Sequence, residues 1–193
     1  MALSLPGMFD FAAPPRTGVC WFVKACRCSN LMLFPNSGSV AASFHPWPTP
    51  REDGEVLRVA LVRHPCHWLR SLYDSFRTGL YLENASLSRL WGQFVEIRKD
   101  SFESFVLDCI EKMPGKITAI FDSYKADVRM RIEDMPWALT ELLDSLGVEK
   151  SLLDKIASLP PVARSRNKSE WKAGLFDRVV AVEKQFCEDL DYY

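Results

Sequence analysis

The feature that most constrains the fold of this chain is the segment Leu57-Arg58-Val59-Ala60-Leu61-Val62, which runs directly into Arg63-His64-Pro65. Its apolar, β-branched composition is typical of a strand buried in a parallel sheet. Proline is favoured at the first helical position because its missing N–H would have no partner there. From Pro65 onward, apolar residues recur at helical spacing: Leu69, Leu72, Tyr73 and Phe76. A buried strand followed at once by an amphipathic helix indicates an α/β fold.

The same alternation of strands and helices continues along the chain. A first short strand is expected to end near Ala12 or Ala13, and another is expected over 128–132. Helical spacing predicts helices over 19–28, from Ser101, over about 116–124, 135–146 and 151–159, and one last helix that carries Leu175, Val179, Val182, Phe186 and Leu190. Residues 31–54 are rich in proline and glycine, which predicts a loop with at most a short strand over 40–44. We therefore expect a single α/β domain over residues 1–193, with a central parallel β-sheet flanked by helices on both faces.

Composition argues against several classes of function. The 193 residues carry a net charge of −1, so no overall positive field draws the chain to nucleic acid or to an anionic membrane. No stretch approaches the roughly 18 apolar residues of a membrane span, and residues 1–10 do not resemble a signal peptide. The six cysteines lack the spacing of a structural zinc site. We expect a reduced, cytoplasmic protein that needs no metal.

The first candidate site is the segment Pro15-Arg16-Thr17-Gly18-Val19-Cys20-Trp21, between the first strand and the helix over 19–28. A glycine in a tight turn lets successive N–H groups point outward, and the start of a helix adds its positive dipole end. Arg16 supplies a permanent cation, and the Thr17 hydroxyl can add a hydrogen bond. The segment is not a Walker A loop, because Gly-x-x-x-x-Gly-Lys-Ser/Thr is absent. It predicts a cradle for phosphate or sulfate, with an ordinary surface turn as the alternative.

A second candidate site follows the strand over 57–62. Arg63 lies directly after the strand, and Ser71 lies about two turns into the next helix. Ligands of parallel sheets bind at the carboxyl ends of the strands, so Arg16 and Arg63 are expected on the same rim. Charge-assisted hydrogen bonds from arginine to phosphate are strong and directional. The alternative is that Arg63 pairs with a nearby carboxylate and that Ser71 is merely exposed.

These segments resemble those of a known enzyme family. Pro-Arg-Thr-Gly-Val-Cys-Trp at 15–21 resembles the 5′-phosphosulfate loop of sulfotransferases that use 3′-phosphoadenosine-5′-phosphosulfate (PAPS), whose usual form is Pro-Lys-Ser/Thr-Gly-Thr-Thr-Trp. Val-Arg-His-Pro at 62–65, followed by Ser71, resembles the 3′-phosphate motif of the family. The segments 131–136 and 186–192 are similar to its Arg-Tyr-Glu-Asp-Leu segment and to its C-terminal helix. The resemblance extends from about residue 9 to the end and implies a P-loop NTPase-like sulfotransferase domain.

The resemblance implies a role for each matched residue. Arg16 stands where the family has the lysine that neutralises charge on the leaving phosphate oxygen. The loop N–H groups around the 5′-phosphosulfate would come from Thr17, Gly18, Val19 and Cys20. Trp21 stands where a tryptophan stacks on adenine, the alternative being a core tryptophan. Arg63 and Ser71 match the pair that holds the 3′-phosphate.

Two departures from the family pattern bear on catalysis. Val19 and Cys20 replace two threonines, so two hydroxyl donors are reduced to at most a weak thiol. Arg16 in place of lysine keeps the positive charge but changes its shape. Nucleotide binding can survive both changes while sulfuryl transfer slows.

The general base and a third anion contact come from loop regions. His45 lies in a proline-rich loop comparable to the one in which many family members carry a catalytic histidine; a structural loop histidine is the alternative. His64, next to Arg63, is expected to cap its own helix. Arg166 and Lys168 belong to a late basic segment similar in composition to the family loop over the 3′-phosphate and adenine. A solvated basic loop is the alternative for that segment.

The expected reaction moves a sulfuryl group from PAPS to an acceptor hydroxyl or amine and leaves adenosine 3′,5′-bisphosphate (PAP) as product. Three alternatives stay open. The first is a catalytically inactive protein that binds PAP or PAPS. The second is another phosphate-handling P-loop-like enzyme, such as a small kinase. The third is an interaction module without a ligand site.

Overall fold

The computed structural model describes residues 2–5, 8–14, 16–28, 31, 34–35, 57–77, 93–94, 96–97, 100–160 and 169–193. These residues form two compact units, each assembled from two stretches of the chain. The first, here called the sheet unit, comprises Met1–Arg63 and Ser123–Arg164. The second, the helical unit, comprises His64–Asp122 and Ser165–Tyr193. Each unit is described by itself.

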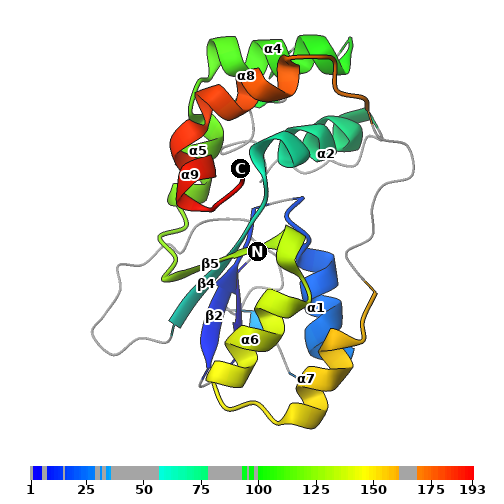
Figure 1. Cartoon of the computed structure of the whole chain (residues 1–193), viewed down its shortest axis with the longest axis vertical. Helices are drawn as coiled ribbons and strands as arrows, with labels where there is room; N and C mark the ends of the chain where they lie inside the picture. The colour runs from blue at the N-terminus through cyan, green and yellow to red at the C-terminus, as the bar shows by residue number, and fades with distance from the viewer. Residues whose placement is uncertain are drawn as a thin grey trace. The chain divides into compact units, whose positions relative to one another are not determined.

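The sheet unit is built on a five-stranded sheet with the order β3-β1-β2-β4-β5. Figure 1 labels β2, β4 and β5 of this sheet. Its strands are β1 (Ala2–Leu5), β2 (Phe9–Ala12), β3 (Phe34–Pro35), β4 (Leu57–Val62) and β5 (Val128–Arg131). β2, β4 and β5 are parallel, whereas β1 is antiparallel to both β2 and β3. Ala60 pairs with Ala12 and Val62 pairs with Arg131, so the three parallel strands end at one edge of the sheet.

Three α-helices of the sheet unit pack their apolar residues against the strands: α1 (Val19–Cys28), α6 (Trp137–Ser145) and α7 (Lys150–Ala157). A short 3₁₀ turn, Ile132–Asp134, connects β5 toward α6. Residues on one side of the strands enter a shared core with these helices, because side chains alternate along a strand. Phe11 of β2 stacks on Phe22 of α1 with ring centroids 3.8 Å apart. This packing fixes α1 directly against the strand that precedes it.

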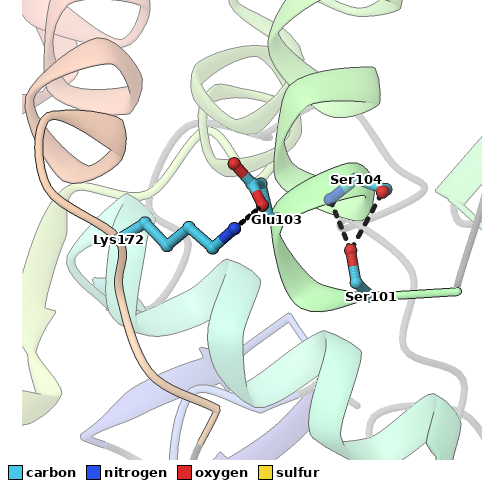
Figure 2. Close-up of polar contacts among 4 residues, drawn as sticks. All are labelled: Ser101, Glu103, Ser104 and Lys172. Carbon is cyan, nitrogen blue, oxygen red and sulfur yellow. Dashed lines mark hydrogen bonds and ion pairs between the residues drawn. The ribbon is translucent and has the colours of Figure 1, made fainter.

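The helical unit contains α2 (Pro65–Arg77), α4 (Phe102–Lys112), α5 (Lys116–Asp122), α8 (Leu175–Val182) and α9 (Lys184–Asp189). Its core is strongly aromatic, and the ring of Trp68 packs edge-on against Phe94 and Phe121. Figure 2 shows the start of α4, where the Ser101 hydroxyl accepts from the Ser104 N–H and caps the helix. In the same view Lys172 reaches Glu103 in an ion pair.

Most of the predicted elements are confirmed, and the parallel arrangement holds for β2, β4 and β5. The strands β1 and β3 were not predicted; they are short, and they extend the sheet by antiparallel pairing. The prediction of a single last helix is wrong, since α8 ends and α9 begins at Glu183. The break is a local change of backbone angles: Glu183 has φ −102° and ψ 28°, outside the helical range, although its N–H still donates to the Val179 carbonyl oxygen at 3.0 Å.

Some predictions are not tested by these elements. The expected short strand over 40–44 lies outside the described residues. Coverage of the sheet on both faces and a single domain over 1–193 depend on how the two units are placed, and they stay predictions. Among the described residues, no helix is both long enough and apolar enough to span a bilayer.

Candidate anion-binding site

The connection from β2 to α1 has an unusual backbone. Arg16 has a φ of 68° and Gly18 a φ of 87°, both in the left-handed region, while Thr17 between them keeps a negative φ. Val19 then begins α1 with helical geometry, so the sign of φ alternates over four successive residues. Backbone that alternates in this way turns successive N–H groups toward one concave side, where they can bind an anion. We call residues 16–20 the cradle.

Hydrogen bonds within the sheet unit define the cradle further. The Thr17 hydroxyl donates to the Pro14 carbonyl oxygen at 2.6 Å, and the Thr17 side chain is fully buried. The Gly18 carbonyl oxygen accepts from the N–H groups of Trp21 at 2.9 Å and Phe22 at 3.1 Å, which closes the first turn of α1. The N–H groups of Val19 and Cys20, at the first two helical positions, lie too early in α1 to have an acceptor within the helix. They are the natural donors for an anion at this helix start.

Arg63 joins the cradle from the end of β4. Its Nη1 atom donates to the Arg16 carbonyl oxygen at 2.7 Å. The two segments are separated by 47 positions in the sequence, and the parallel strands β2 and β4 bring them together at one edge of the sheet. The predicted proximity of Arg16 and Arg63 is therefore confirmed, although the contact is between a side chain and the backbone.

A third arginine lies at the same edge of the sheet. Arg131 is the last residue of β5, opposite Val62 in the register, and its Nε atom pairs with the Asp134 carboxylate at 2.5 Å. In the sequence, Arg131 stands out only as part of a segment similar to the sulfotransferase family. Its position at the end of a predicted parallel strand was the signal that places it at this edge.

Trp21 is packed into the sheet unit. Its side chain is only 9% exposed and belongs to the core formed by α1, α6, α7 and the strands. The indole Nε1 donates to the Pro160 carbonyl oxygen at 2.8 Å. Most of the ring is therefore buried, as expected for the alternative in which Trp21 is a core tryptophan.

The candidates in the helical unit are placed separately. Ser71 lies half-buried in α2, and its pairing with Arg63 stays a prediction because it involves both units. His64 caps α2 as predicted, since its Nδ1 accepts from the Cys66 N–H at 3.2 Å. His45, Arg166 and Lys168 lie outside the described residues, as does Pro15.

The described cysteine side chains are free thiols. Cys20 is exposed at the start of α1, whereas Cys26, Cys66, Cys109 and Cys187 are buried. Within the part of the chain that the structure describes, no group of three or more His, Cys, Asp or Glu side chains is arranged to hold a metal ion. The groups available to a ligand at the cradle are backbone N–H groups, the guanidinium groups of Arg16 and Arg63, and the Cys20 thiol.

No protein family, no curated protein and no solved structure matches this chain. What the site can do follows from its own geometry: a helix start after a loop of alternating φ, bonded to the Arg63 guanidinium, suits a phosphate or sulfate group.

Proposed function

We propose that this chain is a PAPS-dependent sulfotransferase in which the cradle receives the 5′-phosphosulfate. The observation that carries the proposal is the alternating backbone at Arg16, Thr17 and Gly18, with the Arg63 guanidinium bonded to the same loop. Such a site offers several N–H donors and fixed positive charge to one anion. The resemblance of residues 15–21 and 62–71 to the family motifs gives that anion its identity, and it implies a P-loop NTPase-like fold.

The bound PAPS supplies the sulfuryl group and a phosphate leaving group. In the proposal, the N–H groups of Thr17, Gly18, Val19 and Cys20 hold the phosphosulfate in line with the acceptor. Arg16 stabilises the negative charge that grows on the phosphate oxygen as its bond to sulfur breaks. His45 takes the proton of the attacking acceptor hydroxyl or amine, and Arg63 and Ser71 hold the 3′-phosphate.

Two structural details sharpen these roles. The Thr17 hydroxyl donates a hydrogen bond to the Pro14 carbonyl oxygen, so Thr17 would serve an anion through its N–H group. Trp21 is 9% exposed, which leaves little of its surface for contact with adenine. Arg166 and Lys168, in the basic segment, complete the proposed nucleotide site on the resemblance alone.

A protein that binds PAP or PAPS without transferring sulfate is the second candidate. The exposed Cys20 thiol and the Val19 side chain stand where the family has hydroxyl groups, and the Thr17 hydroxyl is engaged within the loop. The backbone donors needed for binding would remain, while side-chain donors that assist the transfer would be reduced.

Calorimetric titration with PAP, AMP and ATP tests the proposal. We expect PAP to bind more tightly than AMP, and Arg16→Ala to weaken both by roughly tenfold because a charge-assisted contact is lost. Arg27→Ala, an exposed arginine in the last turn of α1, is the matched control and should leave binding unchanged. PAP binding no tighter than AMP binding would refute the nucleotide assignment. Transfer from labelled PAPS to an acceptor panel then separates the enzyme from the inactive binding protein.

A further inference from the structure

The backbone conformation of Arg16 needs support from elsewhere in the sheet unit. A φ of 68° is unfavourable for a residue with a Cβ atom, and Arg16 adopts it next to Gly18, for which a positive φ costs little. Left alone, residue 16 would relax toward a negative φ, and the alternation that aligns the N–H groups would be lost. Some contact must therefore favour the left-handed state of Arg16.

Two side chains donate hydrogen bonds to carbonyl oxygens of this loop, one before Arg16 and one on Arg16 itself. Thr17 Oγ1 donates to Pro14 O at 2.6 Å, and Arg63 Nη1 donates to Arg16 O at 2.7 Å. The bond from Arg63 carries a full positive charge and is the stronger kind. Because it ends on the carbonyl of the left-handed residue itself, it acts directly on the orientation of the peptide group between Arg16 and Thr17.

Arg63 is well placed to act as a rigid support. It follows β4, in which Val59, Ala60, Leu61 and Val62 are each at most 2% exposed. That strand is paired on both sides, with β2 and with β5. The paired strand therefore fixes the start of the Arg63 side chain, whose Nη1 atom is bonded to the loop.

We infer that Arg63 is a positioning residue for the cradle: it holds Arg16 in the left-handed conformation and so pre-aligns the N–H groups that receive the 5′-phosphosulfate. This inference deepens the proposed function and rests on it for the identity of the ligand. It differs from the role implied by the resemblance, in which Arg63 contacts only the 3′-phosphate. A guanidinium group has five N–H donors, so one bond to the loop is compatible with a second contact to a phosphate.

Amide hydrogen exchange on the ligand-free protein tests the support directly. The Trp21 and Phe22 N–H groups are bonded to Gly18 O, so their exchange rates report opening of the loop and of the first turn of α1. We expect Arg63→Ala to accelerate both rates about tenfold, and Arg63→Lys, which keeps a charged donor, to accelerate them less. Arg27→Ala on the exposed end of α1 should leave both rates unchanged.

A suppressor variant shows whether the effect passes through φ of residue 16. Glycine adopts the left-handed conformation without a Cβ penalty, so Arg16→Gly added to Arg63→Ala should slow the exchange of Trp21 and Phe22 again. A general loss of stability in Arg63→Ala would instead accelerate exchange throughout the sheet unit, not only at Trp21 and Phe22. If Arg63→Ala does not fold, the same comparison is made with Arg63→Gln, which removes the charge and keeps an N–H donor.

Titration with two ligands completes the test. AMP has the 5′-phosphate but lacks the 3′-phosphate, so a residue that contacts only the 3′-phosphate has no effect on it. We expect Arg63→Ala to weaken AMP binding roughly tenfold and PAP binding by at least as much. Unchanged exchange rates, or AMP binding that is unchanged while PAP binding falls, would overturn the inference. If neither nucleotide binds to the wild-type protein, the proposed function fails, while the exchange rates still decide whether Arg63 supports the loop.

Discussion

Three helix starts in the helical unit are capped by side chains, whereas α1 in the sheet unit starts after a glycine. In the helical unit, α2 is capped by His64 and α4 by Ser101, and α5 is capped by the buried carboxylate of Glu183. In the sheet unit, α1 is preceded by Gly18, which has no side chain with which to cap it. α8 and α9 of the helical unit have no side-chain cap, and neither do α6 and α7 of the sheet unit. What sets α1 apart is the Arg63 guanidinium bonded to the loop before it, which suits an anion at this helix start.

The largest effect that should distinguish the two units is on the free energy of unfolding at alkaline pH. Burial raises the pKa of the Cys26 thiol from 9.0 to about 12 and that of Cys187 from 9.0 to about 11, and it also raises the pKa values of Cys66 and Cys109. Above pH 9.0 the unfolded chain loses these protons while the folded chain keeps them. The stabilisation is therefore complete below that pH and is lost as the pH rises toward the folded values, by about 1.4 kcal/mol per pH unit for each thiol.

Three of these four thiols lie in the helical unit, so alkaline opening should reach that unit first. Urea unfolding at a series of pH values, with amide exchange resolved by residue, measures this order. The variant Cys109→Ala should reduce the slope of stability against pH. Equal slopes in the variant and the wild-type protein would show that Cys109 does not contribute to the loss of stability at alkaline pH.

The next largest effect is expected for Glu183→Ala. The Glu183 carboxylate accepts from the Ile117 N–H at 3.3 Å, the Thr118 N–H at 2.9 Å and the Thr118 hydroxyl at 2.5 Å. Its removal leaves partly buried donors unsatisfied, and we expect the free energy of unfolding to fall by about 3 kcal/mol. Glu183→Gln keeps one acceptor oxygen and should lose less than half as much. A loss under about 1 kcal/mol in urea unfolding of the alanine variant would show that this cap is unimportant.

A smaller effect distinguishes the cradle from an ordinary turn. Gly18 and Gly147 both have positive φ, at 87° and 77°, so alanine at either position should cost about 1–2 kcal/mol of stability. Gly147 follows the last turn of α6, and a Cβ atom there would meet no other atom within 4 Å. Only Gly18→Ala should also weaken AMP and PAP binding in calorimetry. Equal binding by both variants would remove the cradle from the nucleotide site.

The smallest effect is expected at the surface of the helical unit. Lys172 and Glu103 form an ion pair in Figure 2, but the Lys172 side chain is 68% exposed. Lys172→Ala should therefore change the free energy of unfolding by less than about 0.5 kcal/mol. Ser101→Ala, two residues before Glu103, removes a helix cap and should cost about 1 kcal/mol. The reverse order in thermal or urea unfolding would mean that the ion pair matters more than the cap.

The sequence was most informative where a pattern is local. The segment 57–62 forms β4 and residues 19–28 form α1 with the predicted bounds, because each has strong strand or helix periodicity. The meeting of Arg16 and Arg63 followed from the rule that parallel strands end at one edge of a sheet.

Features that depend on distant residues could not be predicted in this way. The Glu183 carboxylate bonds to residues 65 and 66 positions earlier, and no local pattern encodes those partners. The left-handed φ of Arg16 is also unexpected from composition, since residues with a Cβ atom seldom adopt it. Trp21 is held by Pro160, at a separation of 139 positions, so its burial was one of two alternatives until the fold was known.

The bond between Trp21 and Pro160 has a consequence for the synthesis of the chain. The sheet unit is interrupted by His64–Asp122, and β5, α6 and α7 are translated only after that insertion. The helical unit is split in the same manner and needs residues up to the C-terminus. On the ribosome, β4 must therefore wait for β5, and Trp21 must wait for Pro160; long-range contacts of this kind slow folding. Neither unit can be completed until most of the chain has been made.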